Sequence, residues 1–189
     1  MLKELVTNSR SRRTFKSGCN IPHGELVELV ELTRACPAAM NLQPLKYRIV
    51  DTADEVSRLL LITRWASSLS IKLPPEGHGP CAFIVICLDK TLAEPRPLFS
   101  IDVGIVAQTM MLGAAEKGYG GCIIGSAAAE RIREVLGLDA HIEPQLILGL
   151  GVPDENVELT DAVDGDIKYY RDESNTHYVP KRPLSEILL

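Results

Sequence analysis

Apolar residues along this chain follow helical spacing in some segments and form unbroken runs in others. Between Pro22 and Pro37 they recur at the i, i+3, i+4 and i+7 positions of one helix face, which predicts a helix that ends before Pro37. Residues 82–88 are apolar without interruption and predict a strand that is buried on both faces. Further helices are predicted at 2–9, 54–65 and 127–136, and further strands at 47–50, 122–124 and 145–150.

The longest predicted helix covers residues 100–117, and its apolar positions extend nearly all the way round. Such a helix has to be buried on most of its sides. In a chain of 189 residues we interpret it as a central helix that also contacts a second subunit, and a core helix of a monomer is the alternative. The glycines at 118, 120 and 121 are expected to end it.

The last part of the chain, from about residue 153 to residue 189, is polar and has weak apolar periodicity. It therefore predicts an irregular tail with little core of its own. Tails of this kind are usually functional or wrap around a partner. The length of the whole chain predicts one domain, residues 1–189.

The net charge and the composition of the chain argue against several classes of function. The net charge of −5 argues against a nucleic-acid-binding protein, for which a basic surface is expected. No run of 18 apolar residues predicts a membrane span, and the first residues do not resemble a signal peptide, so we expect a cytoplasmic protein. The five cysteines and four histidines lack the spacing of disulfide or metal sites, so neither is expected.

No spacing of acids, bases or nucleophiles matches a known catalytic motif. Enzymes without catalytic side chains of their own often depend on the reactivity of a cofactor. The reactivity of this chain would then come from a bound cofactor.

Two basic clusters lie near opposite ends of the chain. Each cluster alone is more typical of a solvated turn, but together they would offset the desolvation of one phosphate dianion, and guanidinium groups match phosphate oxygens in pairs. The first cluster contains Arg10, Arg12, Arg13 and Lys16 with the hydroxyl of Thr14, and the second contains Lys181 and Arg182.

Asn41 and Gln43 offer two side-chain amides in a proline-rich segment. An amide both donates and accepts hydrogen bonds, which suits the edge of a flat heterocycle, although turn formation is the alternative. Gly125 lies where a predicted strand turns into a helix, and without a Cβ its backbone N–H can approach a planar ligand closely. These features together indicate a phosphorylated nucleotide cofactor.

Five motifs in order resemble the nitroreductase family of flavin enzymes. The sequence S-R-R-T-F-K at 11–16 is similar to the family's S-R-R-S/T-x-R/K, and P-A-A-M-N-L-Q-P at 37–44 is similar to its P-S-x-x-N-x-Q-P. Residues 118–125 resemble its G-x-G-x-x-x-I-G after a long central helix. Residues 149–153 resemble its closing strand and G-x-P, and Lys181-Arg182 with Leu184 resembles its basic tail.

The resemblance implies an α+β fold in which helices wrap a mixed, mostly antiparallel sheet. It also implies an intertwined homodimer with FMN at the interface and a C-terminal tail that crosses to the partner. NAD(P)H would pass hydride to flavin N5, and a small acceptor such as a nitroaromatic or a quinone would then take the electrons in a ping-pong cycle. The family's other chemistries, reductive dehalogenation and flavin breakdown, are alternatives, as is a flavin-binding protein without catalysis.

The resemblance also assigns site residues, none of them a catalytic acid or base. Residues 37–41 would reach the ring from the other subunit, and alanines at 38 and 39 replace the usual serines. The loop at 73–80 would serve as a substrate lid. The implied FMN contacts are Arg12, Arg13, Thr14, Lys16, Lys181 and Arg182 for the phosphate and neighbouring atoms, Pro37, Ala38, Ala39, Asn41 and, less directly, Gln43 for the ring, and the backbone N–H of Ile124 or Gly125 for N5.

Overall fold

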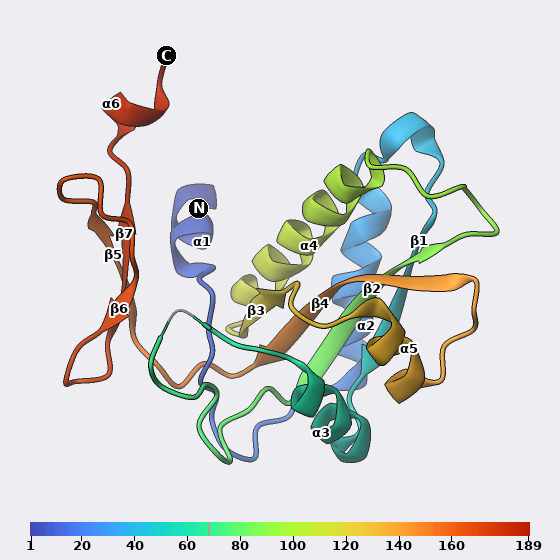
Figure 1. The fold of residues 1–189 in the computed structure, drawn as a ribbon, viewed down its shortest axis with the longest axis horizontal. Helices are drawn as coiled ribbons and strands as arrows, with labels where there is room; N and C mark the ends of the chain where they lie inside the picture. The colour runs from blue at the N-terminus through green and yellow to red at the C-terminus, as the bar shows by residue number, and fades with distance from the viewer. Residues whose placement is uncertain (68) are drawn as a thin grey trace.

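The centre of the molecule is a four-stranded antiparallel sheet in the order β1-β2-β4-β3 (Figure 1). The computed structural model describes residues 1–67 and 69–189. The strands are β1 (Leu45–Val50), β2 (Ala82–Asp89), β3 (Gly120–Ile124) and β4 (Ile142–Gly151). The predicted α+β fold with a mostly antiparallel sheet is confirmed.

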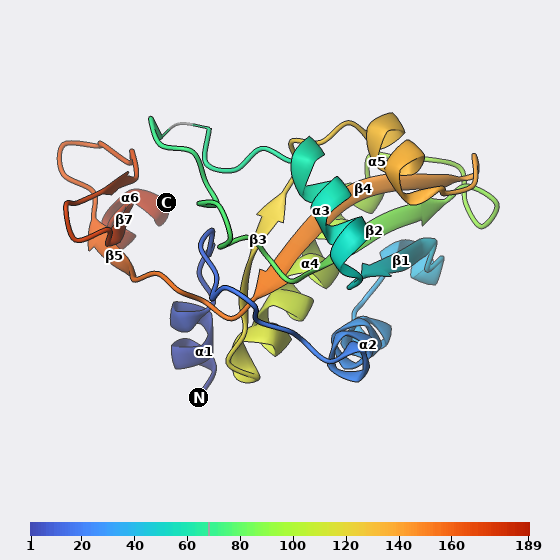
Figure 2. The same cartoon turned by 90° about the horizontal axis from the view of Figure 1, so that it is seen from below.

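Strand β2 carries the core on both of its faces, as its sequence predicts. Within Ala82–Leu88 no residue is more than 3% exposed, and alternate side chains belong to two different clusters. Phe83 and Val85 pack with α3 (Ala53–Ile62) and α5 (Ala129–Leu136). Ile84 and Ile86 pack with α2 (His23–Leu32) and α4 (Phe99–Glu116). The sheet is therefore covered by helices on both faces (Figure 2).

Helix α4 matches the predicted central helix within one residue at each end, and nine of its 18 residues are buried within this chain. At Gly113 an added Cβ would lie 2.5 Å from Leu32 Cδ1, so the absence of a side chain lets α2 and α4 approach closely. Ile101 on α4 remains 57% exposed. A contact between this helix and a second subunit stays a prediction.

Several predicted boundaries shift by a few residues. Helix α2 ends at Leu32 and continues as a 3₁₀ helix, η1 (Thr33–Ala35), before Pro37. Helix α3 ends at Ile62 instead of residue 65, because Thr63 is extended and its hydroxyl accepts a hydrogen bond from Trp65 Nε1 at 2.8 Å. Helix α5 begins two residues later than predicted, and the short N-terminal helix is α1 (Leu2–Asn8).

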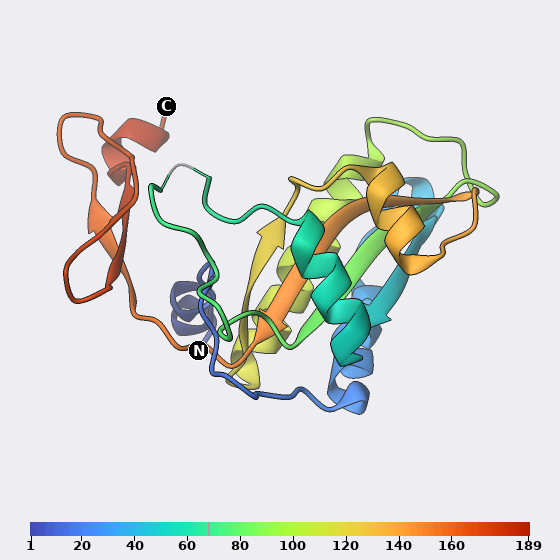
Figure 3. The ribbon, with the colours of Figure 1, turned by 60° about the horizontal axis from the view of Figure 1, so that its bottom comes forward.

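The prediction of an irregular tail is wrong. Residues 153–189, here called the C-terminal module, contain a second sheet in the order β5-β7-β6 and a terminal helix, α6 (Leu184–Ile187). Its strands are β5 (Val157–Asp161), β6 (Tyr170–Arg171) and β7 (His177–Lys181). The module lies beside α1, at the end of the molecule opposite β1 (Figure 1 and Figure 3).

Polar contacts hold this second sheet, which explains why apolar spacing did not reveal it. The Asp172 carboxylate accepts hydrogen bonds from the Thr176 backbone N–H at 2.9 Å and the Ser174 hydroxyl at 2.8 Å. The rings of Tyr170 and Tyr178 stack with centroids 5.1 Å apart across β6 and β7.

Candidate cofactor-binding site

The N-terminal basic motif lies along the free edge of β3. Ser11 forms a parallel bridge with Gly121, and the backbone N–H of Arg12 donates to the Gly121 carbonyl at 2.7 Å. Phe15 is fully buried and bridges Pro153. The motif is thus fixed between the main sheet and the beginning of the C-terminal module.

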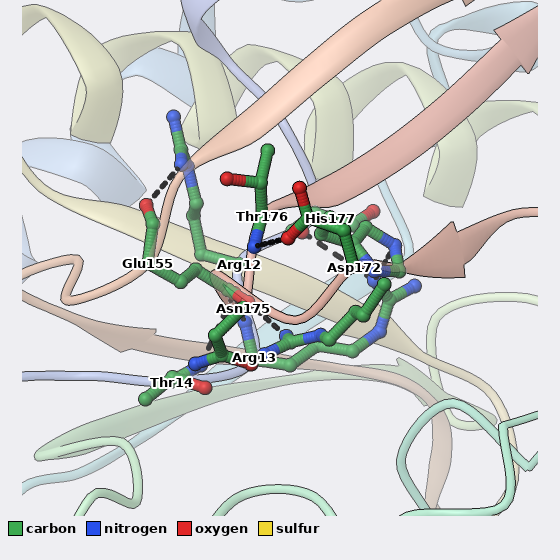
Figure 4. Close-up of polar contacts among 10 residues, drawn as sticks. Arg12, Arg13, Thr14, Glu155, Asp172, Asn175, Thr176 and His177 are labelled. Atoms are coloured by element: carbon green, nitrogen blue, oxygen red, sulfur yellow. Dashed lines mark hydrogen bonds and ion pairs between the residues drawn. The ribbon is translucent and has the colours of Figure 1, made fainter.

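Glu155 joins this motif to the module (Figure 4). Its carboxylate accepts hydrogen bonds from the backbone N–H groups of Arg13 and Thr14 and forms an ion pair with Arg171. Both charged side chains of the pair are almost fully buried. The backbone carbonyl of Glu155 accepts a further bond from Arg12 Nη1 at 2.7 Å. Sequence reasoning missed Glu155 and Arg171, because acidic residues are frequent in this segment and none stands out.

His177 is the second buried polar residue at this junction, and it too escaped the sequence analysis. Its Nε2 lies 3.3 Å from Arg13 Nη1, and its ring is 5.2 Å from that of Tyr169, over which the Arg13 guanidinium also lies. Burial, together with the positive charges of Arg13 and Arg171, lowers the pKa of His177 to about 4. The imidazole is therefore neutral near pH 7.

Basic residues from both ends of the chain meet at one small cavity of about 90 Å³. Arg10, Ser11 and Arg13 line it from the N-terminal side, and His177 and Lys181 line it from β7. The predicted convergence of the two basic clusters thus holds for Arg13 and Lys181.

The other predicted phosphate ligands do not line this cavity. The Arg12 side chain turns to the Glu155 carbonyl, and burial lowers the pKa of its guanidinium group. Lys16 lines a separate cavity of about 550 Å³ beside Cys19, and Arg182 pairs with Glu186 at 3.0 Å on the surface. The Thr14 hydroxyl is buried and has no hydrogen-bond partner among the described residues. Their role in FMN binding stays a prediction.

The proline-rich segment that carries Asn41 and Gln43 forms a strained turn before β1. Met40, Asn41 and Gln43 have φ values of 52°, 54° and 49°, a region that non-glycine residues seldom adopt. The two amides bond each other, with Gln43 Nε2 at 3.0 Å from Asn41 Oδ1. Within a single chain, the side-chain amides of Asn41 and Gln43 therefore stabilise a turn, which was the alternative to ligand binding.

A buried carboxylate on α4 fixes this turn. Asp102 accepts hydrogen bonds from the Ala39 backbone N–H, at 3.0 and 3.1 Å to its two oxygens. Pro37, Ala38 and Asn41 line a cavity of about 140 Å³ with Asp102. Sequence reasoning overlooked Asp102, although a lone carboxylate in an apolar helix was the available signal.

The turn and the basic motif belong to opposite edges of the sheet, since β1 and β3 are its two edge strands. One chain therefore does not place Pro37–Asn41 beside Arg13. Contact of these residues with a flavin ring held by another subunit stays a prediction.

The strand register separates the two backbone amides that the sequence left as alternatives. In an antiparallel ladder the N–H and C=O of one residue point the same way, and successive residues alternate. Because the Gly121 carbonyl faces Arg12 at the outer edge, the polar groups of Ile124 face β4, where Ile124 pairs with Ile147. Gly125, one residue beyond β3, has the amide that is available to a ligand at this edge.

A larger cavity of about 670 Å³ lies between the end of α3 and the segment at 72–79. Leu60, Trp65, Leu73 and Pro74 give it apolar walls, and Lys72 and Glu76 add one charge of each sign. Trp65 also meets Phe15 edge-on, with ring centroids 6.3 Å apart. The predicted lid segment therefore does line a cavity next to the N-terminal motif.

Among residues 1–67 and 69–189, no group of three or more His, Cys, Asp or Glu side chains is arranged to hold an ion. In the same part of the chain, no helix combines the length and apolarity that crossing a bilayer requires.

Comparison with known proteins identifies the family. The model of the nitroreductase family matches residues 6–152, and the chain belongs to this family of oxidoreductases. YdgI of Bacillus subtilis (strain 168), provisionally named an NAD(P)H nitroreductase, is 24% identical over 180 residues that cover 78% of this chain and 86% of YdgI.

Solved structures agree on the fold. A Desulfovibrio desulfuricans protein, provisionally called a nitroreductase and solved in complex with FMN, aligns with a TM-score of 0.72 at 20% identity, covering 100% of this chain and 95% of that one. An FMN-dependent nitroreductase from Clostridium difficile R20291 aligns with a TM-score of 0.65 at 21% identity, covering 85% and 91%. The likeness to the first of these structures extends over the C-terminal module.

Proposed function

We propose that this protein is an FMN-dependent oxidoreductase that takes hydride from NAD(P)H and passes it to a small acceptor in a ping-pong cycle. The observation that carries the proposal is the meeting of Arg13 and Lys181, from opposite ends of the chain, at one cavity. Family membership and the names of the relatives, which include NAD(P)H and FMN, support it. When bound, FMN supplies hydride acceptance and donation at its N5 atom.

The residues present fit such a cofactor at two places. Arg13 and Lys181 provide cations for a phosphate, and buried N–H donors beside them have no acceptor among the described residues. The free amide at Gly125 would donate to the edge of the ring, and nothing lies closer than 3.8 Å to the position of its missing Cβ.

The proposal includes a homodimer, since the ring-binding turn lies at the edge of the sheet far from Arg13. Large apolar side chains remain exposed on the two terminal helices, including Leu2 and Val6 on α1 and Leu184 and Ile187 on α6. A second copy that covered them would bring its own Pro37–Asn41 turn to the flavin. Size-exclusion chromatography with light scattering would show a dimer, and a monomer that retains FMN would refute this part.

The acceptor would enter through the 670 Å³ cavity, whose walls are mostly apolar. That size lies within the roughly 300–1,000 Å³ typical of small-molecule sites. Flat apolar acceptors such as quinones or nitroaromatics suit these walls. The loop at 72–79 would exclude water during transfer.

An absorbance experiment tests the proposed function. Purified protein should show a flavin spectrum, which NADPH or NADH bleaches and a quinone or nitroaromatic then restores. A bound flavin that neither nicotinamide bleaches would favour a binding protein without catalysis, and a colourless protein that takes up no added FMN would refute the proposal.

A further inference from the structure

Two of the five cysteines lie side by side, although 62 positions separate them in the sequence, which is why their spacing did not reveal the pair. Cys19 follows the N-terminal basic motif, and Cys81 comes directly before β2. Both line the cavity of about 550 Å³ that also contains Lys16, and their thiols are in hydrogen-bond contact. Both thiols are free and both residues are partly exposed, so reagents in solution can reach the pair.

Backbone hydrogen bonds hold the two cysteines against each other. The Cys19 backbone N–H donates to the Lys16 carbonyl at 3.2 Å, and the Cys81 backbone N–H donates to the Leu150 carbonyl at 2.9 Å. The Ile21 backbone N–H donates to the sulfur of Cys81. Because Ile21 is only 2% exposed, the segment that carries Cys19 is anchored to the core.

The other three cysteines have different surroundings. Cys87 on β2 and Cys122 on β3 are buried, and β4 lies between their strands. Their thiols face backbone carbonyls at 3.8 and 3.6 Å. Cys36 is partly exposed, but its Sγ lies 3.2 Å from Thr109 Oγ1. Cys19 and Cys81 are therefore the thiols that the described part of the chain brings together.

The two thiols of the pair are not equivalent. Burial is the largest cause that raises the pKa of Cys81 to about 12, and the hydrogen bond to Cys19 and the charge of Cys19 raise it further. Cys81 therefore keeps its proton near pH 7 and donates a hydrogen bond to the sulfur of Cys19. Since the thiolate is the nucleophilic form of a cysteine, Cys19 is the sulfur that reacts first. Oxidation of Cys19 then removes two of the causes that raise the pKa of Cys81.

We infer that Cys19 and Cys81 form an oxidation site, at which a hydroperoxide such as hydrogen peroxide converts the two thiols reversibly into a disulfide. The Cys19 thiolate attacks one oxygen of the peroxide, the O–O bond breaks, and the released hydroxide takes up a proton to become water. Cys19 is then a sulfenic acid. The Cys81 sulfur attacks the Cys19 sulfur, and the sulfenic oxygen leaves with the Cys81 proton as a second water. Two electrons thus pass from the thiols to the peroxide.

The disulfide would join the N-terminal segment to the base of the loop at 72–80. Phe15 and His78 already connect these segments, because the Phe15 backbone N–H donates to the His78 carbonyl at 3.0 Å and His78 Nδ1 lies 3.0 Å from the Phe15 carbonyl. The bond would close a loop across the 62 positions between the two cysteines, and such a cross-link stabilises mainly by restricting the unfolded chain. The inference does not depend on the proposed function, since the oxidation needs no bound flavin.

Peptide mapping of the full chain tests the pair. The purified protein is freed of reductant, treated with a small excess of hydrogen peroxide without nicotinamide, alkylated, digested without reduction and analysed by mass spectrometry. The expected product joins the peptides of Cys19 and Cys81, and the thiols that titrate after denaturation should fall from five to three. Dithiothreitol should restore all five. In Cys81→Ser the sulfenic acid of Cys19 has no partner and should be labelled by dimedone, whereas Cys19→Ser should not be labelled.

Cys36→Ser is the matched control, because the thiol of Cys36 is also partly exposed but contacts a hydroxyl group, and this variant should form the disulfide as wild type does. Oxidation of wild type should raise the Tm by about 5 °C or more, reversibly with dithiothreitol, and should leave the Tm of Cys19→Ser unchanged.

The peptide map of the wild-type chain decides even if a variant fails to fold. Five free thiols after the peroxide treatment, or a disulfide that joins other cysteines or two chains, would overturn the inference. A chain that binds no flavin but forms the bond between Cys19 and Cys81 would refute the proposed function and support the oxidation site.

Discussion

The main body and the C-terminal module of this protein are stabilised by opposite kinds of contact. In β2 of the body every residue is buried, and helices cover both faces of the sheet. Among the described residues of the module, Thr176 and His177 alone are buried as whole residues, and Glu155 and Arg171 bury their side chains, so all four buried groups are polar. Glu155 and Arg171 provide its charged junction with the body. Apolar burial thus stabilises the body. The module depends on its paired charges and on a group that would accept hydrogen bonds from its unpaired buried N–H donors.

The largest expected effect comes from opening a cavity in the body. Phe83 is fully buried on β2, so Phe83→Ala should lower the free energy of unfolding by about 3–5 kcal/mol. Urea denaturation followed by circular dichroism measures it. Leu61→Ala, at a position on α3 that is 83% exposed, is the control and should change little. A Phe83→Ala loss below about 1 kcal/mol would contradict the account of the body.

A smaller and more local effect is expected from Glu155→Gln. The amide keeps an oxygen for the N–H groups of Arg13 and Thr14 but leaves the buried Arg171 without a counter-charge, at a cost of about 3 kcal/mol. Limited proteolysis should then cut the module while the body resists. Glu186→Gln removes an exposed pair and serves as the control. Equal resistance of Glu155→Gln and wild type would show that the module does not depend on this charge.

The module should also loosen in acid before the body does. The pKa of His177 is about 4 in the folded protein and 6.5 is its ordinary value, so unfolding takes up a proton between these pH values. The contribution of the neutral histidine is complete above about pH 6.5 and is lost as the pH falls toward 4. NMR titration of the imidazole measures the pKa directly, and His177→Gln should flatten this part of the stability profile. A normal pKa near 6.5 would contradict the burial of a neutral ring.

The smallest effect is expected at Arg182. Its pair with Glu186 is about half exposed on both sides, so Arg182→Ala should change the free energy of unfolding by no more than about 0.5 kcal/mol. Because Arg182 does not line the 90 Å³ cavity, the loss of FMN affinity should be smaller than that of Arg13→Ala. If fluorescence titration shows a larger loss of FMN affinity in Arg182→Ala than in Arg13→Ala, Arg182 belongs to the phosphate site, as the sequence predicted.

The difference between the apolar body and the polar module explains which elements the sequence could predict. The runs and helical spacing of apolar residues place β2 and α4 within one or two residues, because burial of these side chains is what forms the elements. The strands of the module escaped detection because Asp172 and the stacked tyrosines hold them, and such contacts leave no periodic signal. Their positions depend on partners far away in the chain.

The sequence likewise predicted some features of the candidate site and missed others. The basic motifs at both ends were visible as residue types, and Arg13 and Lys181 do meet. Which cations meet was not visible, since it depends on the Glu155 carboxylate and carbonyl that turn Arg12 away from Arg13. The role of His177 depends on burial and on its contact with Arg13, neither of which is encoded locally.

Hydrogen–deuterium exchange with and without FMN tests the central claim most directly, that a phosphate from the cofactor completes the junction between the two ends of the chain. The account predicts that saturating FMN slows exchange in β6 and β7, around His177 and Lys181, while β2 is unchanged and riboflavin has little effect on the module. Equal exchange in β7 with and without FMN, or equal protection by FMN and riboflavin, would contradict it.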